Sequence, residues 1–161
     1  MSFAIPAIWP IDRTQLEWFY SFGIRAKHPI YKTRKMHKGV DLSCDRGVPV
    51  YATGDAIVEM TDKGKRRRGY GQQILLNHEF GYQTRYAHLD RILVKEGDRV
   101  SRGQLIGLVG STGGSTGPHL HYEVIYMGRH VNPVNYFNRN MSSDEYKMLM
   151  EKMKHTDLET E

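Results

Sequence analysis

The sequence predicts a mainly β protein, built as an antiparallel β-sandwich or barrel-like sheet with a short helix near its C-terminus. Glycine makes up 16 of the 161 residues, more than the usual share of about 7%, and this favours many tight turns. From Val48 onward, short β-branched or alternating runs follow one another, separated by Gly, Asp or Asn. Short strands at regular spacing are typical of antiparallel sheets.

The expected elements follow in chain order. Residues 12–20 predict a short helix or an irregular segment. Strands are expected in six apolar or alternating runs, at 48–60, 71–79, 82–89, 91–100, 104–110 and 119–127. Residues 143–154 predict a helix, because a cap-like serine and acids begin the run and lysines end it. No repeat or low-complexity linker interrupts the chain, so we expect an N-terminal segment (1–20), one domain (21–139) and a C-terminal helix with an acidic tail (140–161).

Composition excludes several classes of protein. With 39% apolar and 25% charged residues the chain is globular rather than disordered. A single cysteine, Cys44, excludes an intramolecular disulfide framework and a Cys₄ or Cys₂His₂ zinc finger. No run of 18 apolar residues occurs, and the first residues lack the pattern of a secretory signal. The net charge of +5 favours an anionic partner, whether nucleic acid, a membrane surface or a wall polymer.

Histidine is the most informative residue type. His37 and Asp41 stand four residues apart around a glycine, and His88 lies at the end of a predicted strand. His119 and His121 follow a turn rich in glycine, serine and threonine. Because residues i and i+2 of a strand point to the same face, these last two histidines are expected to aim at one spot.

These residue types suit a catalytic zinc site, which takes three His or Asp/Glu ligands and keeps a fourth position for water. His37, Asp41 and one histidine of the pair would satisfy that count. The histidines left over could orient the water, accept its proton or stabilise an oxyanion. Each pattern alone is more common as a surface, capping or packing feature, so spacing by itself leaves the metal site and the structural role both open.

A set of longer motifs resembles the lysostaphin-type (LytM-type) zinc endopeptidases of bacterial cell walls. The resemblance extends over residues 22–137. Its motifs are Phe22-Gly-Ile-Arg25 with His28-Pro-Ile30, the HKGVD run at 37–41, the runs at 47–52, 86–89, 94–100 and 103–107, and GSTGGSTGPHLHYE at 110–123. The resemblance implies a barrel-sandwich fold of the duplicated hybrid-motif kind.

The same resemblance implies roles for individual residues. It makes His37, Asp41 and His121 the ligands of one zinc ion per chain, and it assigns His88 and His119 to the attacking water and the tetrahedral intermediate. It further implies hydrolysis, through a zinc-bound water, of an amide next to glycine or D-alanine in the stems or cross-bridges of peptidoglycan. We expect substrate contacts from four more residues: Arg25, Tyr86, Ser115 and Thr116.

Location and an alternative function also follow from the resemblance. A wall enzyme acts in the cell envelope, periplasmic or extracellular, so an export signal or membrane anchor is expected outside these residues. The alternative is a non-catalytic domain of the same fold that binds the wall or regulates a hydrolase. All five histidine and aspartate positions are present, which favours the enzyme.

Other features rank lower. Cys44 is expected to be a small buried hydrophobe, His78 a structural or rim histidine, and His28 part of a cleft edge, with His130 and His155 on the surface. The basic run Lys63–Arg68 predicts either a solvated hairpin tip or a lip that attracts anionic wall polymer. A nucleic-acid partner is not expected, because no recognition module accompanies the run, and without a long apolar run no membrane contact is expected from these residues.

One further resemblance is weaker. Residues 94–107 are similar to the sandwich-hybrid strands of lipoyl and biotin carrier domains. A carrier has no use for the His-x-x-x-Asp and His-x-His groups, so the peptidase interpretation is favoured.

Overall fold

The structure, a computed structural model, describes residues 3–25, 35–64, 69–115 and 117–137. Its strands are β1 (Trp18–Tyr20), β2 (Gly23–Arg25), β3 (Lys35–His37), β4 (Val40–Ser43), β5 (Pro49–Tyr51), β6 (Ala56–Asp62), β7 (Gln72–Asn77), β8 (Tyr82–Ile92), β9 (Arg99–Val100), β10 (Leu105–Val109), β11 (His119–Tyr126) and β12 (Arg129–Val131). Two short 3₁₀ helices, η1 (Arg13–Gln15) and η2 (Pro133–Tyr136), accompany them. The expected helix at 143–154 lies outside the described residues.

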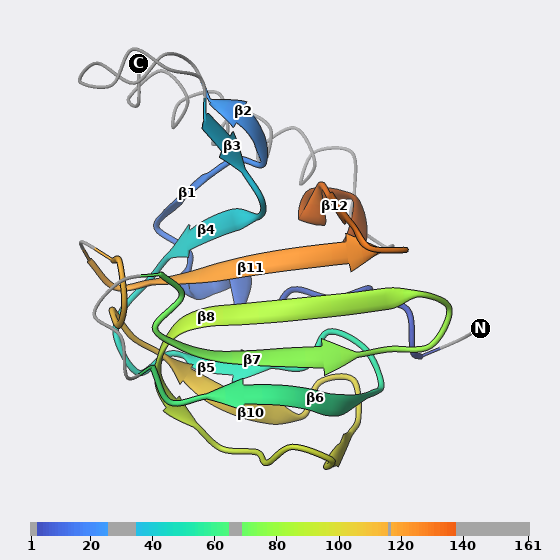
Figure 1. Cartoon of the computed structure of the whole chain (residues 1–161). Helices are drawn as coiled ribbons and strands as arrows, with labels where there is room; N and C mark the ends of the chain where they lie inside the picture. The colour runs from blue at the N-terminus through green and yellow to red at the C-terminus, as the bar shows by residue number, and fades with distance from the viewer. Residues whose placement is uncertain (1–2, 26–34, 65–68, 116, 138–161) are drawn as a thin grey trace.

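The strands form an antiparallel sheet with the order β1-β4-β11-β8-β7-β6-β9 (Figure 1). The β5–β10 ribbon joins this sheet through β8, and β12 extends the other side of β11. In Figure 1 the ribbon lies behind β6 and β7, and Val50, Val58 and Ile106 belong to one hydrophobic core. The prediction of a mainly antiparallel β fold is confirmed, and the sheet is not closed. The pair β2–β3 is separate from it.

Strand β8 organises the sheet because it has different partners along its length. Its first part pairs with β11 as far as Ala87, and its last part pairs with β10 from Leu89 onward. His88 lies between the two parts with φ 60°, a left-handed conformation that non-glycine residues seldom adopt. Its backbone N–H donates to the backbone carbonyl oxygen of Tyr70 (2.8 Å). The sheet therefore branches at His88.

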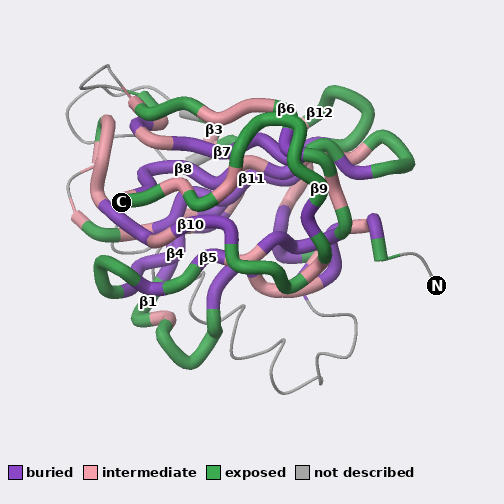
Figure 2. Tube along the Cα trace, turned by 90° about the horizontal axis from the view of Figure 1, so that it is seen from below, coloured by how far each residue is buried: buried purple, intermediate pink, exposed green. Residues whose placement is uncertain are grey.

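The core lies on one face of β4 and β11, as alternation requires. Leu42 and Leu120 are opposite each other and fully buried, and the buried stretches of Figure 2 follow these strands. The N-terminal segment contributes Ile11 and Phe19 to the same core, and β1 pairs with β4. No helix in the described part of the chain is long and apolar enough to cross a membrane.

Candidate metal centre

The outer face of β11 meets the β3–β4 turn at a cluster of histidines. Antiparallel register sets His121 of β11 opposite Asp41 of β4. The imidazole Nδ1 of His121 lies 2.6 Å from Asp41 Oδ1, and His37 Nε2 lies 3.2 Å from Asp41 Oδ2. One candidate ligand atom from each of the three residues falls within 4.8 Å of the others. This set of two nitrogens and one oxygen fits a catalytic zinc site.

Each of the two histidines has a hydrogen-bond partner on the ring nitrogen that points away from Asp41, and this partner determines which nitrogen faces the cluster. His37 Nδ1 lies 2.7 Å from the carbonyl oxygen of Ser21. A carbonyl only accepts, so Nδ1 bears a proton, and Nε2, which faces Asp41, is the nitrogen that a metal would meet in place of a proton. On the far side of His121, Nε2 lies 2.8 Å from the carboxylate of Glu123 and donates to it. That arrangement makes His121 Nδ1, which bonds Asp41, the nitrogen that a metal would take up on release of its proton, and such partners are usual behind metal-binding histidines.

The electrostatics of the cluster favour positive charge. Burial raises the pKa of Asp41, but hydrogen bonds from His121 and His37 outweigh it and hold that pKa far below its usual range. Burial lowers the pKa of His121, yet the hydrogen bonds to Asp41 and Glu123 raise it to about 9. The carboxylate of Glu123 is ionised too, because the same histidine overcomes the effect of burial and lowers its pKa to about 2. Two carboxylates thus surround one imidazole.

His88 and His119 lie beside this cluster, with ring centroids 4.8 Å apart. The Nδ1 of His88 donates to the carbonyl of Thr112 (2.6 Å), and the Nδ1 of His119 donates to the carbonyl of Gly117 (2.9 Å). Both rings therefore keep a lone pair on Nε2 when neutral. Burial lowers the pKa of His88, so its ring is neutral near pH 7. The His119 Nε2 lies 3.8 Å from Asp41 Oδ1.

Residues 35–133, more than half of the chain, match the sequence profile of peptidase family M23. The chain belongs to this family. It is 47% identical over 127 residues to the peptidoglycan DD-endopeptidase ShyA of Vibrio cholerae, a match that covers 77% of this chain and 28% of ShyA. The M23 domain described here therefore spans well under half of that relative.

Two solved structures are similar to this M23 domain. A zinc-containing peptidase from Vibrio cholerae superposes with a TM-score of 0.70 at 39% identity, over 80% of this chain and 39% of that chain. The catalytic domain of lysostaphin, an antimicrobial peptidase from Staphylococcus simulans, gives 0.65 at 32% identity, over 76% of this chain and 92% of that one. The resemblance to lysostaphin-type peptidases is confirmed.

The predicted substrate contacts of the M23 domain have different outcomes. Tyr86 is fully buried with its hydroxyl 2.8 Å from Thr84 Oγ1, so the prediction that it contacts substrate is wrong. Ser115 Oγ lies 3.1 Å from His119 Nδ1, which gives it a role in holding that ring. The side chain of Arg25 and the whole of Thr116 lie outside what the structure describes.

Tyr86 and His88 lie on different faces because His88 interrupts the alternation of β8. In a regular strand the two residues would share a face. The left-handed backbone at His88 turns its ring toward His119, while Tyr86 remains on the core face against Tyr122. Register opposite Tyr122 thus keeps Tyr86 in the core, and the branch point places His88 at the cluster.

Glu123 has no role predicted from the sequence, although it shares the face of β11 with both histidines. Its side chain is fully buried, and Tyr70, Arg85 and His130 also surround it. His130, expected on the surface, is half-buried, and its Nε2 donates to Glu123 Oε1 (3.0 Å). The signal available in the sequence was the spacing of two, because Glu123 follows His119 and His121 at the same interval and so falls on their face.

The remaining candidates follow expectation where the structure describes them. Cys44 is buried in the core, and burial raises the pKa of its thiol to about 12, so it behaves as an apolar residue. His78 is buried and bonded, as a structural histidine would be. His28, His155 and most of the basic run, 65–68, lie outside the described residues.

Gly39, between His37 and Asp41, passes close to β11. A β-carbon there would overlap the carbonyl oxygen of Tyr122 and lie 2.9 Å from Glu123 Cγ. We expect Gly39→Ala to destabilise the domain by about 1–3 kcal/mol and to weaken zinc binding, because the β3–β4 turn must move. Urea unfolding with a chelator and zinc titration measure the two effects. Gly117→Ala, where a β-carbon has open space, is the matched control; equal behaviour of both variants would contradict the explanation.

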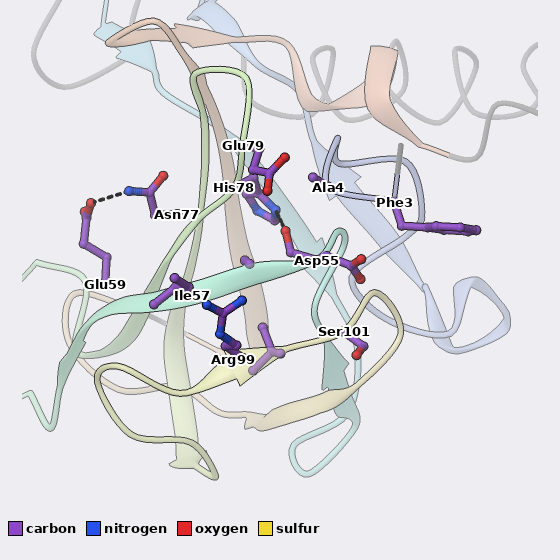
Figure 3. A pocket seen from close by; sticks show the side chains of 12 residues that line it. Phe3, Ala4, Asp55, Ile57, Glu59, Asn77, His78, Glu79, Arg99 and Ser101 are labelled. Carbon is purple, nitrogen blue, oxygen red and sulfur yellow. Dashed lines mark hydrogen bonds between the residues drawn. The ribbon is translucent and has the colours of Figure 1, made fainter. Parts of the chain in front are cut away.

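A separate pocket lies away from the histidine cluster, between β6, β7, β9 and the N-terminal segment (Figure 3). His78 lies in its wall with Nδ1 donating to the carbonyl oxygen of Asp55 (3.0 Å). Its Nε2 lies 2.7 Å from Thr84 Oγ1. Burial lowers the pKa of His78 to about 4, although its hydrogen bonds to backbone carbonyls act in the opposite direction.

This shift predicts a pH-dependent contribution to stability. Between pH 6.5 and 4 the unfolded chain binds a proton at His78, whereas the folded chain does not. The free energy of unfolding therefore falls as the pH falls. The loss approaches about 3 kcal/mol by pH 4. Urea unfolding in the presence of a chelator measures the free energy of unfolding of wild type and of His78→Gln. The difference between these two free energies should become smaller from pH 7 to pH 4.5. A gap of constant size would contradict this account.

Proposed function

We propose that this domain is a zinc-dependent endopeptidase that hydrolyses peptide cross-links of bacterial peptidoglycan. The observation that supports it best is the convergence of His37, Asp41 and His121, each with the ligand atom facing the others. Membership of family M23 supports the reaction class. The ligands in this proposal are His37 Nε2, the Asp41 carboxylate and His121 Nδ1.

Zinc bound there would act as a Lewis acid and lower the pKa of a coordinated water to about 7. The protein supplies the proton transfer. His119 Nε2, close to Asp41, is the acceptor for a proton of the attacking water, and the bonds from Nδ1 to Gly117 and Ser115 keep the ring in position. His88 presents a neutral ring with its proton on Nδ1, so its Nε2 can take up or share a second proton.

The proposed substrate comes from the relatives. ShyA is named a peptidoglycan DD-endopeptidase, and this chain is closer to it in sequence than to lysostaphin. We therefore place the scissile amide between two D-configured centres of a peptide cross-link. Such a substrate sets the site of action in the cell envelope.

The proposal is tested by metal content together with digestion of purified peptidoglycan. The expected result is about one zinc per chain and release of cross-link peptides that stops with a chelator and returns with added zinc. Fragment masses identify the bond and separate endopeptidase from carboxypeptidase cleavage. Zinc binding without any release would overturn the enzymatic proposal and favour a wall-binding or regulatory domain.

A further inference from the structure

Glu123 is a fully buried carboxylate behind the candidate metal centre. The period of β11 places it on the face of His119 and His121, two residues further along the strand. Its Oε2 accepts from His121 Nε2 at 2.8 Å, the ring nitrogen opposite the one that faces Asp41. His121 thus lies between two carboxylates, one on each nitrogen.

The surroundings of Glu123 hold it in place from three further elements. Tyr70, just before β7, donates its hydroxyl to Oε2 at 2.7 Å, and His130 of β12 donates to Oε1 at 3.0 Å. Arg85 of β8 is opposite Glu123 in register and forms an ion pair with Oε1 at 3.4 Å. The Arg85 guanidinium also lies 4.5 Å from the centroid of the Tyr70 ring. These contacts fix both carboxylate oxygens.

The two candidate ligand histidines differ in what lies behind them. His37 donates to a neutral backbone carbonyl, whereas His121 donates to a charged side chain. A carboxylate behind a ligand imidazole fixes the ring orientation, keeps the proton on the outer nitrogen and makes the inner nitrogen more basic. A buried, fully bonded carboxylate has these effects more strongly than a solvated one.

Building on the proposed function, we propose that Glu123 is a positioning residue that sets the zinc affinity of the site through His121, and that Tyr70, Arg85 and His130 form the cage that holds it. Glu123 contacts no substrate in this proposal. It acts on the metal through one imidazole, as the carboxylate of a carboxylate–histidine–metal relay.

The test is the zinc dissociation constant of Glu123→Gln, measured by competition with a chromophoric chelator. Glutamine keeps an acceptor for His121 and removes the negative charge, so we expect zinc binding to weaken roughly 10- to 100-fold. The visible spectrum of the Co²⁺-loaded variant should change as well, because the donor strength of His121 changes. Glu59→Gln is the matched control: this exposed carboxylate bonds only to Asn77 and Gln83 among the described contacts, and its zinc affinity should equal that of wild type.

A second variant keeps the proposal testable if Glu123→Gln unfolds, which urea titration in chelator would reveal. Tyr70→Phe removes one donor to Glu123 and leaves every charge in place, and we expect roughly three- to tenfold weaker zinc binding. Zinc affinity within twofold of wild type in Tyr70→Phe and in a folded Glu123→Gln would overturn the proposal. Failure of the wild type to release peptides while it binds zinc would instead overturn the proposed function and leave this inference intact.

Discussion

Replacing His121 by alanine should remove both zinc and peptidase activity. Its Nδ1 is the nitrogen nearest to Asp41, at 2.6 Å, and the variant retains only His37 and Asp41 of the proposed ligands. The free energy of zinc binding to structural protein sites is roughly 10–16 kcal/mol, which divides among about four ligands. Loss of one ligand therefore predicts zinc affinity lower by about two to three orders of magnitude. Peptide release should fall below detection at micromolar zinc.

The measurement is zinc content after dialysis, together with release of cross-link peptides. Glu59→Gln is a suitable control, because this exposed carboxylate bonds Asn77 and Gln83 and lies outside the histidine cluster. The zinc content of that control should equal that of wild type. Full zinc retention with unchanged turnover in His121→Ala would contradict the ligand assignment.

The sequence predicted the parts of this site that depend on local periodicity. Alternation along 119–127 places two histidines on one face, and β11 has this arrangement. Alternation alone does not decide which histidine approaches Asp41, because that depends on the register of β11 against β4. The paired residues, His121 and Asp41, are 80 residues apart along the chain. Distance then separates the two: 2.6 Å for His121 and 3.8 Å for His119.

The sequence does not predict the residues that act through tertiary contacts. Glu123 belongs to the alternating run, but its partners come from β8, β12 and the loop before β7, which no local pattern connects. Tyr86 was misplaced for a related reason. A single left-handed residue, His88, breaks the strand period, and nothing in the run of side chains at 82–89 signals it. Such backbone exceptions are common at functional sites.

The same geometry predicts the opposite phenotype for the other histidine of β11. His119→Ala should keep zinc at the wild-type level and lose about 10²- to 10⁴-fold in kcat/KM, because it removes a proton acceptor rather than a ligand. Its Nε2 lies 3.8 Å from Asp41 Oδ1, and the set of candidate ligand atoms that all lie within 4.8 Å of one another consists of His37, Asp41 and His121 without His119. Parallel zinc and peptide-release assays on the two alanine variants check this directly.

Ser115→Ala gives the intermediate case: it removes the contact at 3.1 Å to His119 Nδ1 together with the bonds of Ser115 Oγ to Gly117 and Ser111, while the Gly117 carbonyl still accepts from that nitrogen. A fall in turnover of less than about tenfold, with zinc unchanged, is expected when one of two ring-positioning contacts is lost.

Loss of zinc from His119→Ala would exchange the roles of the two histidines. Unchanged turnover in that variant would leave His88 as the proton acceptor, because its neutral ring is the other imidazole at the cluster with an available Nε2.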